Sequence, residues 1–156
     1  MTLTGRAERL SSRSTAPDLA SNAAAGLPGF TAALCLIVVV IHLEDQNWLS
    51  FAKTPVYVQF GYVAIEVVGL VTAWLLVTRP TKLCGVLGFG VGLSPLVGYI
   101  LSRGPGLPSY SDDKGAWSEP LGVVSLVVEG ILIIASVVVF TAREQGVARQ
   151  TWVGAK

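Results

Sequence analysis

The chain has 156 residues, a length suited to one domain, and 52% of them are hydrophobic while only 13% are charged. Soluble domains carry about 25% charged residues, so this composition argues against a water-soluble protein and favours one that lies in lipid. The formal net charge is only +1, which excludes the strongly basic surface of a nucleic-acid-binding protein.

Four apolar segments are each long enough for a membrane-crossing helix, which needs about 20 mainly apolar residues. In chain order they cover residues 23–43, 54–78, 83–102 and 120–141. Pro28, Pro55 and Pro120 lie near the predicted helix starts, where the missing N–H of proline costs least. The expected fold class is therefore all-α, an up-down bundle of four transmembrane helices spanning residues 23–142.

The segments that flank the apolar region have a different composition. Residues 1–22 are rich in Ser, Thr and Arg, which predicts a disordered cytoplasmic tail, and residues 143–156 are expected to form a second cytoplasmic tail. No small-x-small cleavage site follows the first apolar segment, so this segment is expected to remain as an anchor rather than to be removed as a signal peptide.

Lys and Arg residues predict the orientation of these helices. Eight of the 11 lie in the two terminal segments and in the connection at residues 79–82, and the other connections hold only Lys53, Arg103 and Lys114. Cytoplasmic loops carry the excess of Lys and Arg, so both termini are expected in the cytoplasm. The expected location is the cell (plasma) membrane, with several passes through the lipid bilayer.

Small and polar residues recur every three or four positions along the predicted helices, which places them on one face of each helix. The second segment has Gln59, Tyr62 and Glu66, the third has Gly85, Gly88 and Gly92, and the fourth has Gly122, Ser125 and Glu129. Gly88 and Gly92 form a GxxxG pattern, which lets two helix backbones approach closely. This pattern predicts close packing within the bundle or a contact surface for a homo- or hetero-oligomer.

Glu66 and Glu129 are carboxylic acids inside two different predicted spans. Each is about ten residues from the outer end of its helix, or roughly 14–17 Å at a rise of 1.5 Å per residue, near the bilayer centre. A charged side chain there costs at least about 2.5–3.5 kcal/mol, so both are expected to face the interior and to share a pocket. They either hold the bundle together through hydrogen bonds to Tyr62 or Ser125, or bind a cation, a proton or a substrate.

Polar residues near the outer ends of the helices complete the candidate site. His42 precedes Asp45 by one helical turn, so this carboxylate either orients the imidazole or the histidine caps the helix end. Arg103 is expected either to pair with Asp112, Asp113 or Glu119 or to clamp an anionic ligand. Trp117 is more typical of a membrane-interface anchor than of a stacking surface.

Three classes of function remain open. The first is acid–base chemistry, namely isomerisation, cyclisation or epoxide opening, on a lipid-soluble small molecule in an outward-facing site. Its catalytic candidates are Glu66, Glu129, His42 and Tyr62, and its ligand-binding candidates are Asp45, Tyr99, Arg103, Asp113, Trp117 and Glu119. The second is a non-enzymatic accessory subunit or a metal- or partner-binding membrane protein. The third, a proton- or cation-coupled transporter, is disfavoured because the two halves show no inverted repeat.

No cofactor and no metal are expected. A single histidine cannot supply two axial haem ligands, and the chain has neither a phosphate-binding glycine loop nor a zinc motif. Cys35 and Cys84 lie in apolar runs without CxxC spacing, so they are expected to be buried as small apolar residues.

The amino-acid sequences of three stretches resemble those of a known group of proteins. The runs "HLEDQNW", "GYILSRGPGLP" and "WSEPLGVVSLVVEG" resemble those of small four-helix integral membrane proteins of bacterial, actinobacterial type. This resemblance covers most of residues 43–130. It implies membrane residence, directs attention to the charged residues in these runs and implies no particular reaction. The plan of two acids in a small bundle is also similar to that of integral membrane isomerases and terpene cyclases, an analogy of architecture alone.

Overall fold

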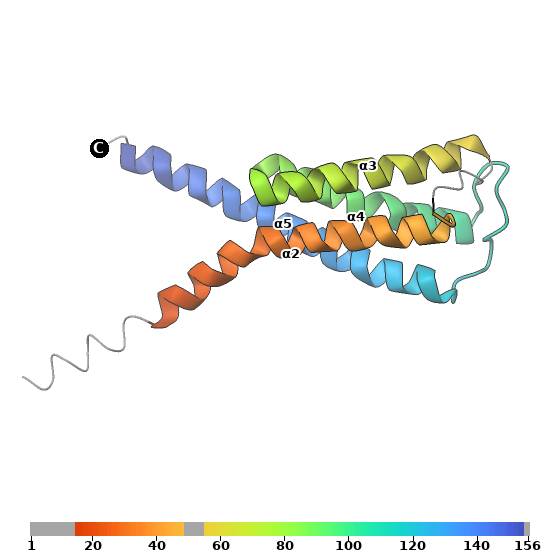
Figure 1. Cartoon of the computed structure of the whole chain (residues 1–156), viewed down its shortest axis with the longest axis horizontal. Helices are drawn as coiled ribbons and strands as arrows, with labels where there is room; N and C mark the ends of the chain where they lie inside the picture. The colour runs from red at the N-terminus through yellow and green to blue at the C-terminus, as the bar shows by residue number, and fades with distance from the viewer. Residues whose placement is uncertain (1–14, 49–54, 155–156) are drawn as a thin grey trace, which may run out of the picture.

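The described part of the chain is all-helical. The computed structural model describes residues 15–48 and 55–154, and it contains four helices there: α2 (Thr15–Asp45), α3 (Val56–Thr78), α4 (Lys82–Arg103) and α5 (Pro120–Gly154) (Figure 1). Each is long and apolar enough to cross a membrane, over Gly26–Asp45, Val56–Thr78, Lys82–Arg103 and Pro120–Arg143. The predicted number, type and approximate position of the apolar helices are confirmed.

Helices α2 and α5 are longer than the sequence predicts. α2 begins at Thr15 instead of residue 23, and α5 continues to Gly154 instead of ending near residue 141. The flanking residues include many Ala, Arg, Glu and Gln, which favour helix, so the helices continue beyond the apolar segments. The predicted tail of residues 1–22 is therefore helical from Thr15, and residues 1–14 and 155–156 lie outside the described residues.

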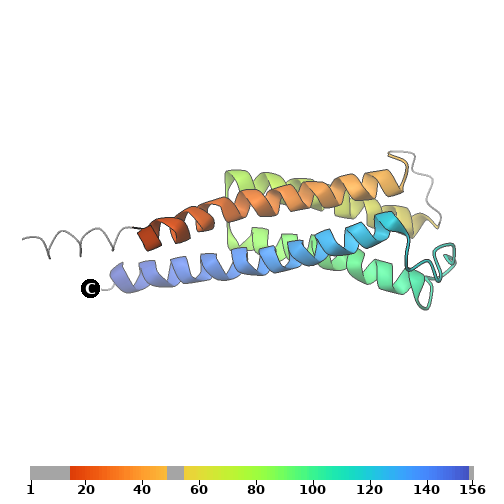
Figure 2. The same cartoon turned by 90° about the horizontal axis from the view of Figure 1, so that it is seen from below.

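The molecule has two different ends. The short connection between α3 and α4 (residues 79–81) defines the hairpin end, where α2 and α5 extend past the other two helices (Figures 1 and 2). The loop of residues 104–119, here named the lid loop, defines the opposite lid end. The half of the bundle near the hairpin end is solidly packed, and the half near the lid end contains the candidate site.

The core fills the half of the bundle near the hairpin end. It consists of apolar side chains from all four helices, among them Cys35, Val38, Leu76, Val91, Leu132 and Val139. Thr31 and Thr72 are fully buried, and each donates its hydroxyl to the backbone carbonyl one turn earlier. Both cysteines are free and buried. In the same half the Ser136 hydroxyl is fully buried and has no hydrogen-bond partner among the described residues, and a smaller apolar pocket of about 230 Å³ lies beside it.

The glycine face of α4 packs against α5 of the same chain. A Cβ atom added to Gly85 would lie 2.9 Å from both the Ser136 carbonyl oxygen and the Phe140 nitrogen. One added to Gly92 would lie 3.0 Å from the Glu129 carbonyl oxygen. The distances at Gly85 are too short for a real side chain, and the one at Gly92 is tighter than most real contacts, so glycine at these positions lets the two backbones approach closely.

Replacing Gly85 by alanine is expected to destabilise the bundle. The new methyl group would meet the backbone of α5, which cannot move without shifting the whole helix, so a loss of about 1–3 kcal/mol is expected from overpacking. Gly90→Ala is the matched control, because a Cβ atom there meets nothing within 4 Å. Thermal unfolding in detergent micelles measures both variants. Equal unfolding temperatures for Gly85→Ala and the wild type would contradict the close contact.

Candidate functional site under the lid loop

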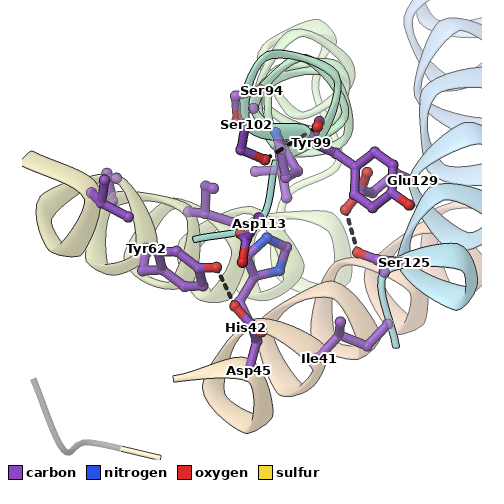
Figure 3. A pocket seen from close by; sticks show the side chains of 18 of the residues that line it. Ile41, His42, Asp45, Tyr62, Ser94, Tyr99, Ser102, Asp113, Ser125 and Glu129 are labelled. Atoms are coloured by element: carbon purple, nitrogen blue, oxygen red, sulfur yellow. Dashed lines mark hydrogen bonds between the residues drawn. The ribbon is translucent and has the colours of Figure 1, made fainter. Parts of the chain in front are cut away.

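A cavity of about 540 Å³ occupies the half of the bundle near the lid end, and all four helices and the lid loop contribute to its lining. Most of its wall area is apolar, and polar side chains from the helices and the lid loop also line it, among them His42, Tyr62 and Glu129 (Figure 3). Binding sites for small molecules usually measure about 300–1,000 Å³ and have this mixture of apolar walls and few polar groups. The cavity is therefore of the right size and character for one lipid-soluble molecule.

Glu129 supplies an unpartnered carboxyl oxygen to this cavity. Its side chain is only 2% exposed, and its Oε1 accepts a hydrogen bond from the Ser125 hydroxyl one turn earlier on α5 (Figure 3). Its Oε2 is buried and has no hydrogen-bond partner among the described residues. Leaving such an atom unsatisfied costs about 1–3 kcal/mol, so this oxygen is placed to receive a hydrogen bond from a bound molecule.

His42 on α2 faces the same cavity. Its Nδ1 lies 2.9 Å from the Val38 carbonyl oxygen, and a carbonyl can only accept, so Nδ1 carries the hydrogen. In the neutral ring Nε2 is then an acceptor. The imidazole is 8% exposed and lies beside the Tyr62 ring, with 5.5 Å between centroids. The Val38 carbonyl thus fixes the imidazole so that a basic nitrogen is available at the cavity.

A row of hydrogen bonds joins the end of α2 to α3. The Tyr62 hydroxyl donates to Asp45, and the Gln46 side-chain amide donates to Glu66. The Gln59 side-chain amide in turn donates to the side-chain oxygen Oε1 of Gln46 at 2.6 Å. Gln46 is 2% exposed and was not among the predicted site residues, although its spacing of four from His42 places both on one helix face. This seam fixes the position of His42 and Asp45.

The two buried glutamates do not line the same cavity. Both are enclosed by the protein, at 7% exposed for Glu66 and 2% for Glu129, but only Glu129 is part of the cavity lining. Tyr62 and Ile65 of α3 face the cavity, and Glu66 follows Ile65, so it points about 100° further round the helix. Glu66 faces α2 instead, where Gln46 binds it.

Arg103 holds the lid loop in place. Its Nε donates to the Ala116 carbonyl at 3.1 Å, and its Nη2 donates to Glu119 Oε2 at 2.9 Å. Its Nη1 lies 3.6 Å from Asp113 Oδ2, and its guanidinium carbon lies 3.9 Å from the Tyr99 ring centroid. The predicted pairing of Arg103 with Asp113 and Glu119 is found. Because these groups use the guanidinium, Arg103 organises the loop and is not offered to an anionic ligand.

Tyr110 closes the lid loop over the cavity. Its side chain is 7% exposed, and its hydroxyl donates to Asp113 Oδ2 at 3.0 Å. Leu107 and Tyr110 exchange two backbone hydrogen bonds, and Gly106 and Gly115 take positive φ angles of 87° and 85° that favour glycine. Burial raises the pKa of Tyr110 above its usual value, and the hydrogen bond to Asp113 and its charge reinforce this shift. Loop residues follow no helical spacing, so the sequence did not identify Tyr110.

Most of the predicted site residues meet at this cavity. Those that line it are His42, Asp45, Tyr62, Tyr99, Arg103, Asp113, Glu119 and Glu129. Trp117 does not line the cavity. Its side chain is 49% exposed, and its ring packs edge-to-face with the Tyr99 ring, with 6.0 Å between the ring centroids. Within residues 26–48 and 55–143, no group of three or more His, Cys, Asp or Glu side chains is arranged to hold a metal ion.

Comparison of the chain with protein-family models, with curated proteins and with solved structures finds no match. Three groups dominate the cavity: the Glu129 carboxyl, the His42 imidazole and the Arg103 network that holds the lid loop above them.

Replacing Arg103 by lysine is expected to loosen the lid loop. A single ammonium group cannot reproduce the planar fork that binds Ala116, Glu119 and Asp113 together, and each charge-assisted hydrogen bond contributes about 1.5–3 kcal/mol. Amide hydrogen exchange in detergent micelles should therefore speed up at least roughly tenfold at Gly115, whose N–H donates to the Arg103 carbonyl. Lys114→Gln serves as the loop control. Unchanged exchange at Gly115 in Arg103→Lys would show that Arg103 does not hold the loop.

The Tyr110 hydroxyl is expected to lose its proton at a higher pH than the hydroxyl of a solvent-exposed tyrosine does. Since its pKa is higher in the folded protein than in the unfolded chain, the stability that it contributes is complete below about pH 10 and declines as the pH rises further. Ultraviolet absorbance of ionised phenol, compared between the wild type and Tyr110→Phe, isolates this one residue. A difference signal that rises with a midpoint at or below about pH 10 would disagree with a buried, hydrogen-bonded hydroxyl.

Proposed function

We propose that this protein binds a lipid-soluble small molecule in the cavity under the lid loop and performs acid–base chemistry on it. The observation that carries the proposal is the unpartnered Oε2 of Glu129 in the same apolar-walled cavity as the imidazole of His42. A group that donates a proton and a group that accepts one, held apart in a site shielded from water, are the requirements for moving a proton within an apolar substrate.

The proposal includes an arrangement in the plasma membrane. The four helices cross it up and down, with both termini in the cytoplasm and the lid loop outside. The distribution of Lys and Arg supports this orientation. Large apolar side chains on the outside of the bundle support contact with lipid, for example Phe60 at 70% exposed, Val77 at 70% and Ile134 at 67%. In this arrangement the cavity lies within the outer half of the bilayer.

The proposed reaction is the isomerisation of a carbon–carbon double bond, alone or within a cyclisation. Glu129 in its protonated form donates its proton to one alkene carbon, and His42 Nε2 removes a proton from a carbon next to the resulting cation. The double bond moves and the substrate keeps its composition. Between turnovers His42 gives up its proton to water and Glu129 takes one from water, which restores the starting state of both groups. General acid–base catalysis of this kind contributes about 10²–10⁴-fold to a rate.

The apolar walls have a part in this chemistry. A carbocation reacts with water at once, so the intermediate survives only where water is excluded. Tyr110 and the Arg103 network cover the cavity at the lid end. The Tyr62 and Tyr99 rings both line it, and an aromatic face next to a cation stabilises it. These features favour proton transfer to carbon over hydrolysis.

Incubation with membrane lipids in heavy water tests the proposal without knowledge of the substrate. Purified protein in detergent micelles is mixed with a total lipid extract from bacterial membranes in D₂O, and mass spectrometry detects lipids that gain deuterium at carbon. At least one lipid is expected to become labelled with the wild type. Glu129→Gln, which cannot supply a proton, should reduce the rate at least about 100-fold.

Glu66→Gln is the matched control, because Glu66 is the other buried glutamate and lies outside the cavity. This variant is expected to label lipids as the wild type does, since glutamine also offers an oxygen to Gln46. Thermal unfolding verifies that both variants are folded. The proposal is wrong if no lipid gains deuterium, or if a folded Glu66→Gln protein loses labelling while Glu129→Gln keeps it.

A further inference from the structure

The cavity has a side opening between α3 and α4. Gly61 and Ala64 on α3, and Gly90 and Ser94 on α4, line the cavity and are also exposed on the surface of the bundle. Because these small residues lie on both sides of the gap between α3 and α4, we infer that the cavity reaches the surface of the bundle between them. All four lie within the membrane-crossing parts of their helices, so in a membrane this opening faces lipid rather than water.

The opening continues toward the hairpin end as an apolar cleft. Val68 of α3 and Val86 of α4 line the cavity there, and they are 38% and 54% exposed. An extended hydrocarbon chain lying between α3 and α4 would cover these side chains. Of the described helices, α3 and α4 are neighbours in sequence, yet they pack together less than α4 packs with α5 or α2 with α3.

Glycines on two faces of α4 have different structural roles. Gly85, Gly88 and Gly92 are pressed against α5, where a Cβ atom would collide with it. Gly90, on the face toward the cleft, would carry a Cβ atom with nothing within 4 Å, and the same holds for Gly61 across the cleft. Close packing therefore does not explain Gly61 and Gly90. Their effect is to keep the cleft wide.

The unpartnered Oε2 of Glu129 lies in the cavity that this cleft enters. Glu129 is nine residues along α5 from Pro120, or about 14 Å at the rise of a helix. A hydrocarbon chain in the cleft would reach the cavity at this depth. The bound molecule thus needs an apolar body for the cleft and one hydrogen-bonding group for Glu129.

We propose that the cleft between α3 and α4 admits a lipid alcohol sideways from the bilayer, with its hydroxyl on Glu129 Oε2 and its hydrocarbon chain between the two helices. This inference rests on the proposed function and names its class of substrate. The hydroxyl binds Glu129 Oε2 as the molecule enters and leaves it before the same carboxyl protonates the double bond. A hydroxyl both donates and accepts, so it fits this carboxyl oxygen in either state of protonation. A lipid with an ammonium or phosphate head group is excluded, because its charge would have to pass through the middle of the bilayer to reach the cleft, which is costly.

The lid end does not offer an equal route. Arg103 ties the lid loop to Asp113, Ala116 and Glu119, and Tyr57 on α3 donates its hydroxyl to the Pro108 carbonyl at 2.6 Å. Entry from water would require these contacts to break. Entry between α3 and α4 requires only the displacement of lipid from a surface lined by small residues.

Photo-crosslinking in liposomes tests this route. The full chain is reconstituted into phosphatidylcholine liposomes that contain hexadecanol with a diazirine group on its chain, and the matched probe is the hydrocarbon with the same chain and diazirine group but no hydroxyl. After illumination, mass spectrometry maps the labelled peptides. The alcohol is expected to label the α3 and α4 residues that line the cleft, at least tenfold more than the hydrocarbon does, because the hydrocarbon can neither donate a hydrogen bond to Glu129 nor accept one from it.

Leucine at position 90 is expected to block the cleft. Gly90→Leu has room for its side chain without touching α5 and should reduce labelling of the cleft at least tenfold. Gly130→Leu is the matched control, since Gly130 also has nothing within 4 Å but does not line the cavity, and its labelling should equal that of the wild type. If Gly90→Leu fails to fold, Gly61→Leu blocks the cleft from α3.

The inference is overturned if the alcohol and the hydrocarbon label the cleft equally, or if folded Gly90→Leu and Gly61→Leu proteins are labelled as the wild type is. It is also overturned if Gly90→Leu leaves deuterium incorporation at the wild-type rate, an outcome that keeps the acid–base chemistry and removes the side entrance. Conversely, alcohol-specific labelling that Gly90→Leu abolishes supports the entrance even if no lipid gains deuterium, and then only the proposed reaction falls.

Discussion

The close approach of α4 to α5 decides where this protein is solid and where it is hollow. Three glycines spaced along one face of α4 let its backbone contact that of α5. On its other side α4 packs less extensively against α3 than it does against α5. The space left between α4 and α3 becomes the cavity near the lid end and the cleft along the bundle. Both proposed properties of the protein, the site and its side entrance, follow from this one contact.

Polar groups in the bundle are satisfied in two ways, and the contrast identifies the site. Near the hairpin end, Thr31 and Thr72 bond to their own helices, and at the α2–α3 seam Gln46 binds Glu66. These groups need no further partner and contribute to stability. Glu129 receives one hydrogen bond from Ser125 and leaves its second oxygen without one. The Ser136 hydroxyl is also buried without a partner, but of these two residues only Glu129 lines the cavity under the lid loop. An unsatisfied carboxyl oxygen in a low-dielectric interior is costly to keep for structure alone, and the proposed function therefore centres on Glu129.

The sequence predicted the site residues on the helices better than those in the loops or at the helix ends. Burial of Glu66 and Glu129 follows from the cost of a carboxyl group in lipid, and the pairing of Arg103 with Asp113 and Glu119 follows from opposite charges close in sequence. Tyr110 and Gln46 were not predicted. Tyr110 belongs to a loop whose hydrogen bonds depend on positive φ angles at Gly106 and Gly115, and Gln46 matters only because of where α3 places Glu66.

The sequence by itself determined the number of apolar helices, the side chains that must avoid lipid, and the small-residue face that brings two helices together, because hydrophobicity and helical spacing are local properties. Only the tertiary structure decided that Glu66 belongs to a seam and Glu129 to a cavity. The two glutamates lie on helices that differ in rotation and in axial position. α3 begins beyond the end of α2, and Gln46, which follows the last residue of α2, therefore reaches Glu66, ten residues into α3. Depth counted along each helix separately cannot reveal such an offset, since it depends on how the helices pack.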